Sequence, residues 1–208
     1  MASKKRFAAS AEKNKDPILG VLKKYVRSGE GEQRCLEIAS GTGQHIVHYA
    51  AAFPRITFQP SECTETNLSS IQEYLTDSNL TNILSPVNVD ITSSIDQWNL
   101  IHPHYDFLIN VNMIHISPWQ CTLELFKKAN QLLEKDGLLF TYGPYSDRGV
   151  ISPESNINFN NYLIETNAEW GLRDIEDLKT VASQNNFLLD AIEEMPSNNK
   201  TLIWKKLN

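Results

Sequence analysis

The residues of this chain that could do chemistry gather around one glycine-bearing turn. Residues 35–45 read as an apolar strand containing a carboxylate, Glu37, then a turn with Gly41 and Gly43, then the start of a helix. Glycine adopts backbone angles closed to other residues and leaves no side chain between the backbone and a ligand. The first turn of a helix also presents free N–H groups. The pattern therefore predicts a site for a nucleotide-like ligand.

A dinucleotide fits this turn poorly. Its fingerprint needs a third glycine three residues after Gly43, where the chain has Ile46. Glu37 would sit badly beside two phosphates but well beside a cationic or hydroxyl-bearing ligand, so an NAD-dependent reductase is disfavoured. The expected cofactor contacts at the turn are Glu37, Ala39, Ser40, Gly41, Thr42 and Gly43.

Other polar residues follow the expected strands. In open α/β sheets, ligands lie beyond the carboxyl ends of the strands, where the strand order reverses. Glu62 is placed to accept both hydroxyls of a ribose, and the alternative is a solvated loop charge. Asp90 could accept a hydrogen bond from an adenine amino group, cap the next helix, or do both. His45 could face the ligand or merely pack.

The segment that follows the fourth expected strand, residues 110–119, is a further candidate. The same strand-end rule selects Asn110, Asn112 and Met113 as cofactor contacts. His115 could take a proton from a substrate nucleophile, although a structural role that ties the loop to the sheet is slightly favoured. Tyr145 could line a substrate pocket or simply pack.

Alternating strands and helices must position these residues. We expect strands at 34–38, 56–59, 82–89, 105–111, 138–142, 187–193 and 201–205. We expect helices from Asp16-Pro17, at 43–53, 65–75 and 94–98, from Pro118 to about 136, within 143–171, and after a cap at Asp174. This order predicts a single-domain, Rossmann-like α/β fold with a mainly parallel seven-stranded sheet and helices on both faces. The last two strands are too close for a crossover helix, so they should form an antiparallel hairpin.

Several stretches resemble the methyltransferase-like 26 family of class I S-adenosylmethionine (SAM) methyltransferases, over nearly the whole chain. They are residues 11–18, 36–45, 59–62, 112–119, 143–145, 155–156, 170–174 and 195–199. The resemblance implies SAM as cofactor and methyl transfer as activity, with the loop after the fourth strand nearest the reactive methyl group. Lys13 stands where Arg is expected, Glu62 where Asp is common, and Asn160 where an acidic residue is usual. The last difference puts a catalytic carboxylate at that position in doubt.

The helix that precedes the first strand offers one more candidate. In this fold such helices often close over the cofactor, which would place Lys13 and Asn14 at a lid. The alternative is a plain solvated helix start, which both residues also suit.

Composition sets the remaining expectations. The 208 residues suit one domain, residues 11–208, after a flexible tail of residues 1–10. With no apolar run of membrane-spanning length and no signal peptide, we expect a cytoplasmic protein that could also be nuclear, with no membrane partner. Three scattered cysteines suggest reduced thiols, and the histidines form no metal site. A net charge of -6 argues against nucleic acid.

Two function classes remain beside the disfavoured reductase. The first is an enzyme that transfers a methyl group from SAM to a small or medium-sized acceptor, and the second is a SAM-binding regulatory protein without catalysis. Residues 143–171 contain the aromatic side chains Tyr145, Phe159, Tyr162 and Trp170. An aromatic-rich segment suits a small organic or peptide-like acceptor enclosed away from water.

Overall fold

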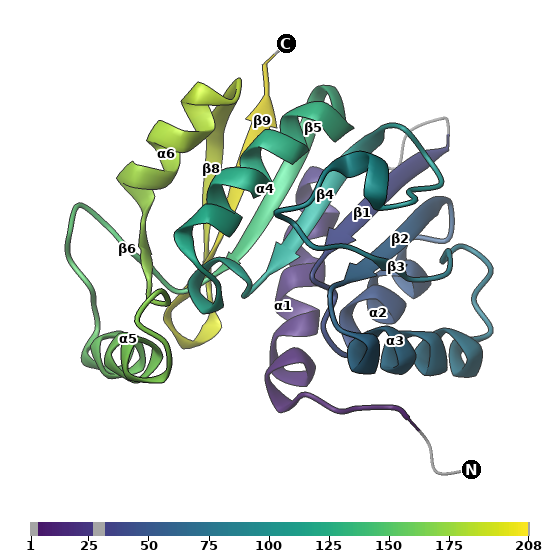
Figure 1. Ribbon diagram of the computed structural model, residues 1–208, viewed down its shortest axis with the longest axis horizontal. Coiled ribbons are helices and arrows are strands. Elements are labelled where there is room, and N and C mark those ends of the chain that lie inside the picture. The colour runs from purple at the N-terminus through teal and green to yellow at the C-terminus, as the bar shows by residue number, and fades with distance from the viewer. Residues whose placement is uncertain (1–3, 27–31, 208) are drawn as a thin grey trace. The chain divides into compact units, whose positions relative to one another are not determined.

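The computed structural model describes residues 4–26 and 32–207, and it contains two compact units, Met1–Ile109 and Asn110–Asn208 (Figure 1). The first unit holds α1 (Ala9–Tyr25), β1 (Gln33–Ile38), α2 (Gln44–Ala52), β2 (Ile56–Glu62), α3 (Glu65–Ser78), β3 (Val87–Asn88), the 3-10 turn η1 (Ile95–Gln97) and most of β4 (Tyr105–Val111). The second holds η2 (Ile114–Ile116), α4 (Trp119–Leu132), β5 (Leu133–Gly143), β6 (Tyr145–Ser146), α5 (Glu154–Thr166), β7 (Arg173–Asp174), α6 (Ile175–Gln184), β8 (Phe187–Met195), η3 (Pro196–Asn198) and β9 (Asn199–Lys206).

The strands form a seven-stranded sheet in the order β3-β2-β1-β4-β5-β9-β8. β1, β2 and β3 pair in parallel, whereas β9 runs antiparallel to both β5 and β8. The predicted α/β fold, a mostly parallel sheet closed by an antiparallel hairpin, is therefore confirmed. The strand order reverses at β1, which directs attention to the turn that follows it.

The core of the first unit explains why β1 and α2 form where the sequence predicts them. In β1 the apolar residues Cys35, Leu36 and Ile38 are all buried. α2 buries Ile46 and Tyr49, which lie three residues apart on one helix face. Gly43, in the left-handed conformation, precedes α2, and Phe53 follows it.

The first helix begins earlier than predicted. α1 starts at Ala9 rather than at Asp16, and Pro17 lies inside it. The earlier turns are held by tertiary contacts that no local pattern shows, because Asn14 is buried and Glu12 accepts a hydrogen bond from Gln44 Nε2 (3.1 Å). Asp16 is no helix cap but pairs with His48 (2.8 Å).

Part of the expected flexible tail contacts α3. The Arg6 backbone N–H donates to Ser70 Oγ (2.8 Å), and its guanidinium donates to Asn67 Oδ1 (2.8 Å). Lys5 pairs with Asp77 (2.7 Å) and lies over the Tyr74 ring. Residues 1–3 lie outside the described residues.

In the first unit, the predicted lengths of the second and third strands need correction. β2 continues through Pro60 to Glu62, because Pro60 pairs with Glu37 in the parallel register. The third strand shrinks from the predicted 82–89 to Val87–Asn88. Asn82 Nδ2 instead donates to three carbonyl oxygens, those of Ala50, Phe53 and Ile56, so a side chain holds the chain there.

In the second unit, α4 is shorter than predicted and β5 longer. α4 ends at Leu132, and β5 begins at Leu133, which we had expected on the buried face of the helix. The Lys206 ammonium donates to the carbonyl oxygens of Asn130 and Leu133 (2.6 and 2.7 Å), so β9 satisfies the end of α4. The sequence also gave no sign of the small parallel pair of β6 and β7.

We predict that Gly43→Ala destabilises the protein more than Gly41→Ala. A Cβ on Gly43 would lie 2.9 Å from the Ile71 Cα, at a φ of +97°. A Cβ on Gly41 would meet nothing within 4 Å, so only its positive φ is strained, at roughly 1–2 kcal/mol. Urea unfolding of both variants measures the difference. Equal losses of unfolding free energy would show that α3 does not constrain the turn.

Candidate functional site

The turn after β1 is built from left-handed residues. Ala39, Gly41 and Gly43 have φ of 59°, 60° and 97°. Gly43 brings the backbone against Ile71 of α3, whereas the position of a Cβ on Gly41 is open space. The turn is therefore anchored at Gly43 and open at Gly41, as a backbone that approaches a ligand requires.

Two serines join the ends of β1 and β2. The Ser40 N–H donates to the Ser61 carbonyl (2.8 Å), and the Ser61 N–H donates to Ser40 Oγ (3.1 Å). Ser61 Oγ donates to the Glu37 carbonyl (2.7 Å). The Ser40 hydroxyl also donates to that carbonyl (3.3 Å), so this side chain fixes the turn.

Glu62 is a buried carboxylate that grips the same turn. Its Oε2 accepts a hydrogen bond from the Gly41 N–H (3.0 Å), and its Oε1 accepts one from the Cys63 N–H (2.8 Å). The alternative of a solvated loop charge does not hold, because Glu62 is only 6% exposed. A contact with ribose hydroxyls stays a prediction.

Glu37 is a buried carboxylate near the end of β1. The residue is 1% exposed, and neither carboxylate oxygen has a hydrogen-bond partner among the described residues. Burial raises the pKa of Glu37 from 4.5 to about 8, against a smaller lowering by the Ser40 side chain, and the charge of Glu62 adds to the rise. A buried carboxylate is stable only with donors or a cation beside it. Glu37 therefore marks a place for a positively charged or hydrogen-bond-donating group.

His45 and Asn14 form one contact between α1 and α2. His45 Nε2 lies 2.7 Å from Asn14 Oδ1, and the imidazole stacks on the Tyr49 ring at 5.6 Å. Burial lowers the pKa of His45 to about 4, so the ring is neutral near pH 7 and donates its Nε2 proton to Asn14. Both residues are buried, so α1 is not a plain solvated helix. Their contact with a cofactor stays a prediction.

Gln44 and Ser70 were not recognised from the sequence, yet both hold the turn. Gln44 Oε1 accepts hydrogen bonds from Thr42 Oγ1 (3.0 Å) and from the Ala8 N–H (2.6 Å). Ser70 Oγ donates to the Thr42 carbonyl (2.8 Å). Only the place of Gln44 directly after the turn could have suggested its role; nothing local distinguishes Ser70.

Asp90 caps the turn that follows it. Its Oδ1 accepts hydrogen bonds from the Thr92 N–H (2.9 Å) and Thr92 Oγ1 (2.7 Å). The Asp90 carbonyl accepts one from Trp98 Nε1 (3.2 Å). Asp90 is therefore not the cap of the next helix, because the N-cap of η1 is Ser94. The adenine contact stays a prediction.

In the second unit, the chain after β4 turns sharply at Asn112. Asn110 is buried, and its Nδ2 lies 3.6 Å from Met113 Sδ. Asn112 has a φ of 63°, and its N–H donates to the Tyr142 carbonyl (2.8 Å). This bond fixes the segment, and the cofactor contacts expected of Asn110, Asn112 and Met113 remain predictions.

His115 is a buried, neutral imidazole. A Cβ on Gly143 would lie 2.9 Å from its Nδ1, so the ring packs against bare backbone, and Phe159 meets it edge-on at 5.7 Å. Burial, and secondarily the charge of Arg173, lowers the pKa of His115 to about 4. The favoured structural role is therefore present. Proton transfer by His115 stays a prediction.

Arg173 holds the turn around His115. This role of Arg173 was not predicted from the sequence. Its Nε donates to the Ile114 carbonyl (3.2 Å), and its Nη2 donates to the Ser117 carbonyl (2.7 Å). Its guanidinium lies 5.6 Å from the Trp119 ring centre. The only signal was its place in the motif at residues 170–174.

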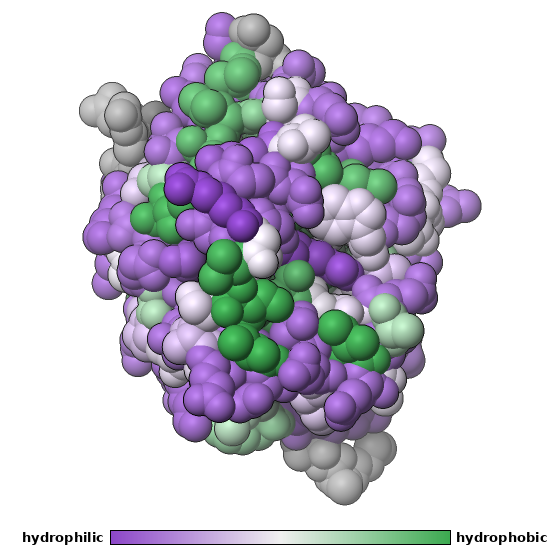
Figure 2. Space-filling model, turned by 90° about the vertical axis from the view of Figure 1, so that its left-hand side faces the viewer, coloured by the Kyte–Doolittle hydropathy of each residue, from purple (hydrophilic) through white to green (hydrophobic). Residues whose placement is uncertain are grey.

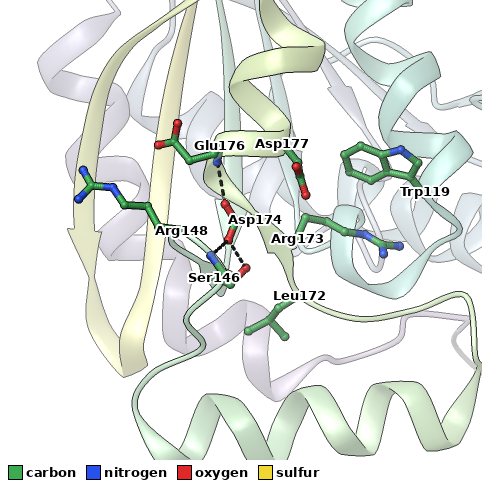
Figure 3. Close-up of a pocket in the computed structure, with 9 residues that line it drawn as sticks. Trp119, Ser146, Arg148, Leu172, Arg173, Asp174, Glu176 and Asp177 are labelled. Atoms are coloured by element: carbon green, nitrogen blue, oxygen red, sulfur yellow. Dashed lines mark hydrogen bonds between the residues drawn. The ribbon is translucent and has the colours of Figure 1, made fainter.

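Arg173 also borders a pocket of about 570 Å³ (Figure 3). Asp174 accepts hydrogen bonds there from Ser146 Oγ (2.8 Å), the Gly149 N–H (2.7 Å) and the Glu176 N–H (2.9 Å), so it is a structural anchor. Arg173 extends toward Trp119 and Arg148 points the opposite way (Figure 3). Three carboxylates and two guanidinium groups line the pocket, which leaves it without the excess of positive charge that a polyanion needs.

Tyr145 is a buried tyrosine of the second unit. It lies on β6, in register with Arg173 of β7. The residue is 5% exposed, and its hydroxyl has no hydrogen-bond partner among the described residues. Burial raises its pKa, so the phenol stays protonated. Its role toward a substrate stays a prediction.

The described residues contain no group of three or more histidine, cysteine or acidic side chains that could hold a metal ion. In the same part of the chain, no helix has the length and apolar character needed to cross a membrane.

We predict that Glu37→Gln stabilises the ligand-free protein at pH 8 but hardly at pH 5. With a folded pKa near 8, the native state holds a proton that the unfolded state releases above its pKa of 4.5. The free energy of unfolding of the wild type should therefore fall as the pH rises from 4.5 to 8. The slope should be at most about 1.4 kcal/mol per pH unit. Urea unfolding from pH 5 to pH 8 measures this. A stability difference that is independent of pH would mean that Glu37 is ionised in the free protein.

Several solved structures of methyltransferases share this fold. The chain is similar to an O-methyltransferase family protein from Burkholderia thailandensis, with a TM-score of 0.78 and 12% identity over 96% of this chain and 58% of that one. It is also similar to the SAM-dependent methyltransferase SibL (0.77, 14%, covering 96% and 56%) and to human N-acetylserotonin methyltransferase (0.76, 14%, covering 96% and 53%). The chain thus spans somewhat more than half the length of these proteins, and the likeness shows the fold.

A family comparison covers nearly the whole sequence. Residues 5–206 match the family described as "Protein of unknown function (DUF938)". The match includes the glycine turn, Glu37 and Glu62 of the first unit, and the His115 turn and Arg173 of the second. The chain belongs to the DUF938 family.

Proposed function

We propose that this protein is a SAM-dependent methyltransferase. The observation that carries the proposal is Glu37, a buried carboxylate whose oxygens have no hydrogen-bond partner in the part of the chain that the structure describes. It lies at the end of β1, directly before a turn with open space at Gly41. The fold is that of proteins whose structures hold SAM or its product S-adenosylhomocysteine. The membership of this chain in the methyltransferase-like 26 family is part of the same proposal.

The residues of the first unit fit the chemical groups of SAM. Glu37 would face the ammonium of the methionine part, which supplies the positive charge that the buried carboxylate lacks. Glu62 would accept the ribose hydroxyls while it holds the Gly41 N–H. The bare backbone at Gly41 would allow the ligand to lie close.

Little further chemistry is required of the protein. SAM supplies a methyl group on a sulfonium, which is a good leaving group. The protein must then hold an acceptor in line with that methyl group and exclude water, and such positioning accounts for much of the rate. A catalytic triad is unnecessary. The neutral imidazole of His115 can accept a proton, and Tyr145 offers a protonated hydroxyl.

The surface of the second unit suits a small organic or peptide-like acceptor. α5 exposes Ile157 and Ile164, and its exposed Tyr162 stacks with Phe159, which meets His115. Figure 2 shows such apolar patches on the side that carries α5 and α6. Proteins with this fold include a mitomycin 7-O-methyltransferase and N-acetylserotonin methyltransferase, whose names describe small acceptors. Nucleic acid and membrane are not proposed as partners, and the expected location is the cytoplasm.

We predict that Glu62→Ala weakens binding of S-adenosylhomocysteine about tenfold to hundredfold, because a hydrogen bond to a charged group contributes roughly 1.5–3 kcal/mol. Glu62→Gln is the matched control, since its amide oxygen can still accept the Gly41 N–H and should lose less. Isothermal titration calorimetry measures both. A change of less than about twofold in Glu62→Ala would exclude Glu62 from the site.

We predict transfer of tritium from methyl-labelled SAM to a small molecule or peptide in a cell extract. Gly41→Val is the control, because its methyl groups would fill the open space at the turn and resist a φ of +60°. It should stay folded by circular dichroism and transfer nothing. Wild-type protein that binds SAM but transfers no label to any extract would favour the regulatory alternative.

A further inference from the structure

We propose that ligand binding exchanges the proton of Glu37 for the positive charge of the ligand's amino group, so that this site selects cationic ligands and releases a proton when it binds them. The inference deepens the proposed function and rests on it. It concerns the first unit alone, where the residues of the turn and both carboxylates lie.

The geometry requires Glu37 to be neutral before a ligand arrives. Its two oxygens are buried and have no donor among the described residues. The Ser40 and Ser61 hydroxyls both donate to the Glu37 carbonyl oxygen. The Ser40 side chain lowers the pKa of the Glu37 carboxyl, but by less than burial raises it. An ionised carboxylate in this position would lose its hydration and gain nothing in return.

None of the charged groups that act on the Glu37 carboxyl is a cation. Glu62 of β2 is an acidic neighbour, and its oxygens are already engaged by the N–H groups of Gly41 and Cys63. Cys35 of β1 is a fully buried thiol whose pKa is raised by burial, so it stays neutral. Asp106 of β4 acts on Cys35 and is acidic too. These groups provide no cation for Glu37, so the missing charge must come from the ligand.

The exchange has a simple proton balance. The O–H bond of the Glu37 carboxyl breaks, its proton passes to the buffer, and the carboxylate pairs with the ligand ammonium without forming a covalent bond. Because the pKa of the free protein's Glu37 is about 8, affinity should rise about tenfold per pH unit below pH 8 and level off above it. A ligand without the ammonium should show no such dependence.

Two ligands separate this effect from nucleoside binding. S-Adenosylhomocysteine carries the ammonium, whereas 5′-methylthioadenosine keeps the nucleoside and the thioether but lacks the amino acid. Calorimetric titration of the full chain with each ligand at pH 6, 7 and 8, in buffers of different ionisation enthalpy, gives both the affinity and the protons released. Glu37→Gln keeps the shape of the side chain and removes the charge.

With wild-type protein we expect S-adenosylhomocysteine to release close to one proton at pH 6 and 7 and to bind roughly 50-fold more tightly at pH 8 than at pH 6. 5′-Methylthioadenosine should release none. Glu37→Gln should remove the proton release and the pH dependence for S-adenosylhomocysteine and leave the affinity of 5′-methylthioadenosine unchanged.

Other outcomes show whether the proton exchange alone is wrong or the proposed function is wrong as well. If the wild type binds S-adenosylhomocysteine equally well at all three pH values without releasing a proton, the exchange is wrong and the proposed function survives. Binding of neither ligand would overturn the proposed function and the exchange together. The wild-type measurement in two buffers decides the question even if Glu37→Gln does not fold.

Discussion

The burial of Glu37 at the end of β1 constrains everything around it. A carboxyl group with no donor, beside a second carboxylate, costs free energy that the native fold must offset. The fold tolerates it because the backbone on both sides is tightly held. Ser40 and Ser61 join the ends of β1 and β2, and Glu62 fixes the Gly41 N–H. Local order of this kind keeps the turn in shape without a ligand, which is the preorganisation that a binding site needs.

A second set of contacts joins α1 to the same turn. Gln44 accepts hydrogen bonds from Thr42 and from the backbone of Ala8, and it donates to Glu12. One residue later, His45 meets Asn14. The N-terminal helix is therefore part of the architecture of the turn. Because these bonds involve side chains on α1 and α2, a movement of α1 would alter the turn directly.

The second unit uses one arginine in a comparable way. Arg173 binds two carbonyl groups on either side of His115, and Asp174 next to it binds Ser146 and Gly149. Asn160 Oδ1 accepts the Leu172 N–H (2.8 Å), so this position has a structural task in place of the carboxylate chemistry that was in doubt. The motif at residues 170–174 thus serves mainly to hold loops together. Its two charged residues, Arg173 and Asp174, form most of their hydrogen bonds with backbone groups.

The sequence by itself determined the fold class, the closing hairpin, the positions of β1, β4 and α2, and the glycine turn with its two carboxylates. These depend on apolar periodicity, on Gly, and on the distance between strands, all of which are local. Only the tertiary structure decided that α1 begins at Ala9, that residues 82–86 are mostly not strand, and that β6 pairs with β7. It also decided that the Glu37 carboxylate has no hydrogen-bond partner within residues 4–26 and 32–207, and that Gln44, Ser70 and Arg173 hold the loops. The physical reason is that hydrogen bonds between residues distant in sequence, and the desolvation of a side chain, depend on neighbours that folding brings together.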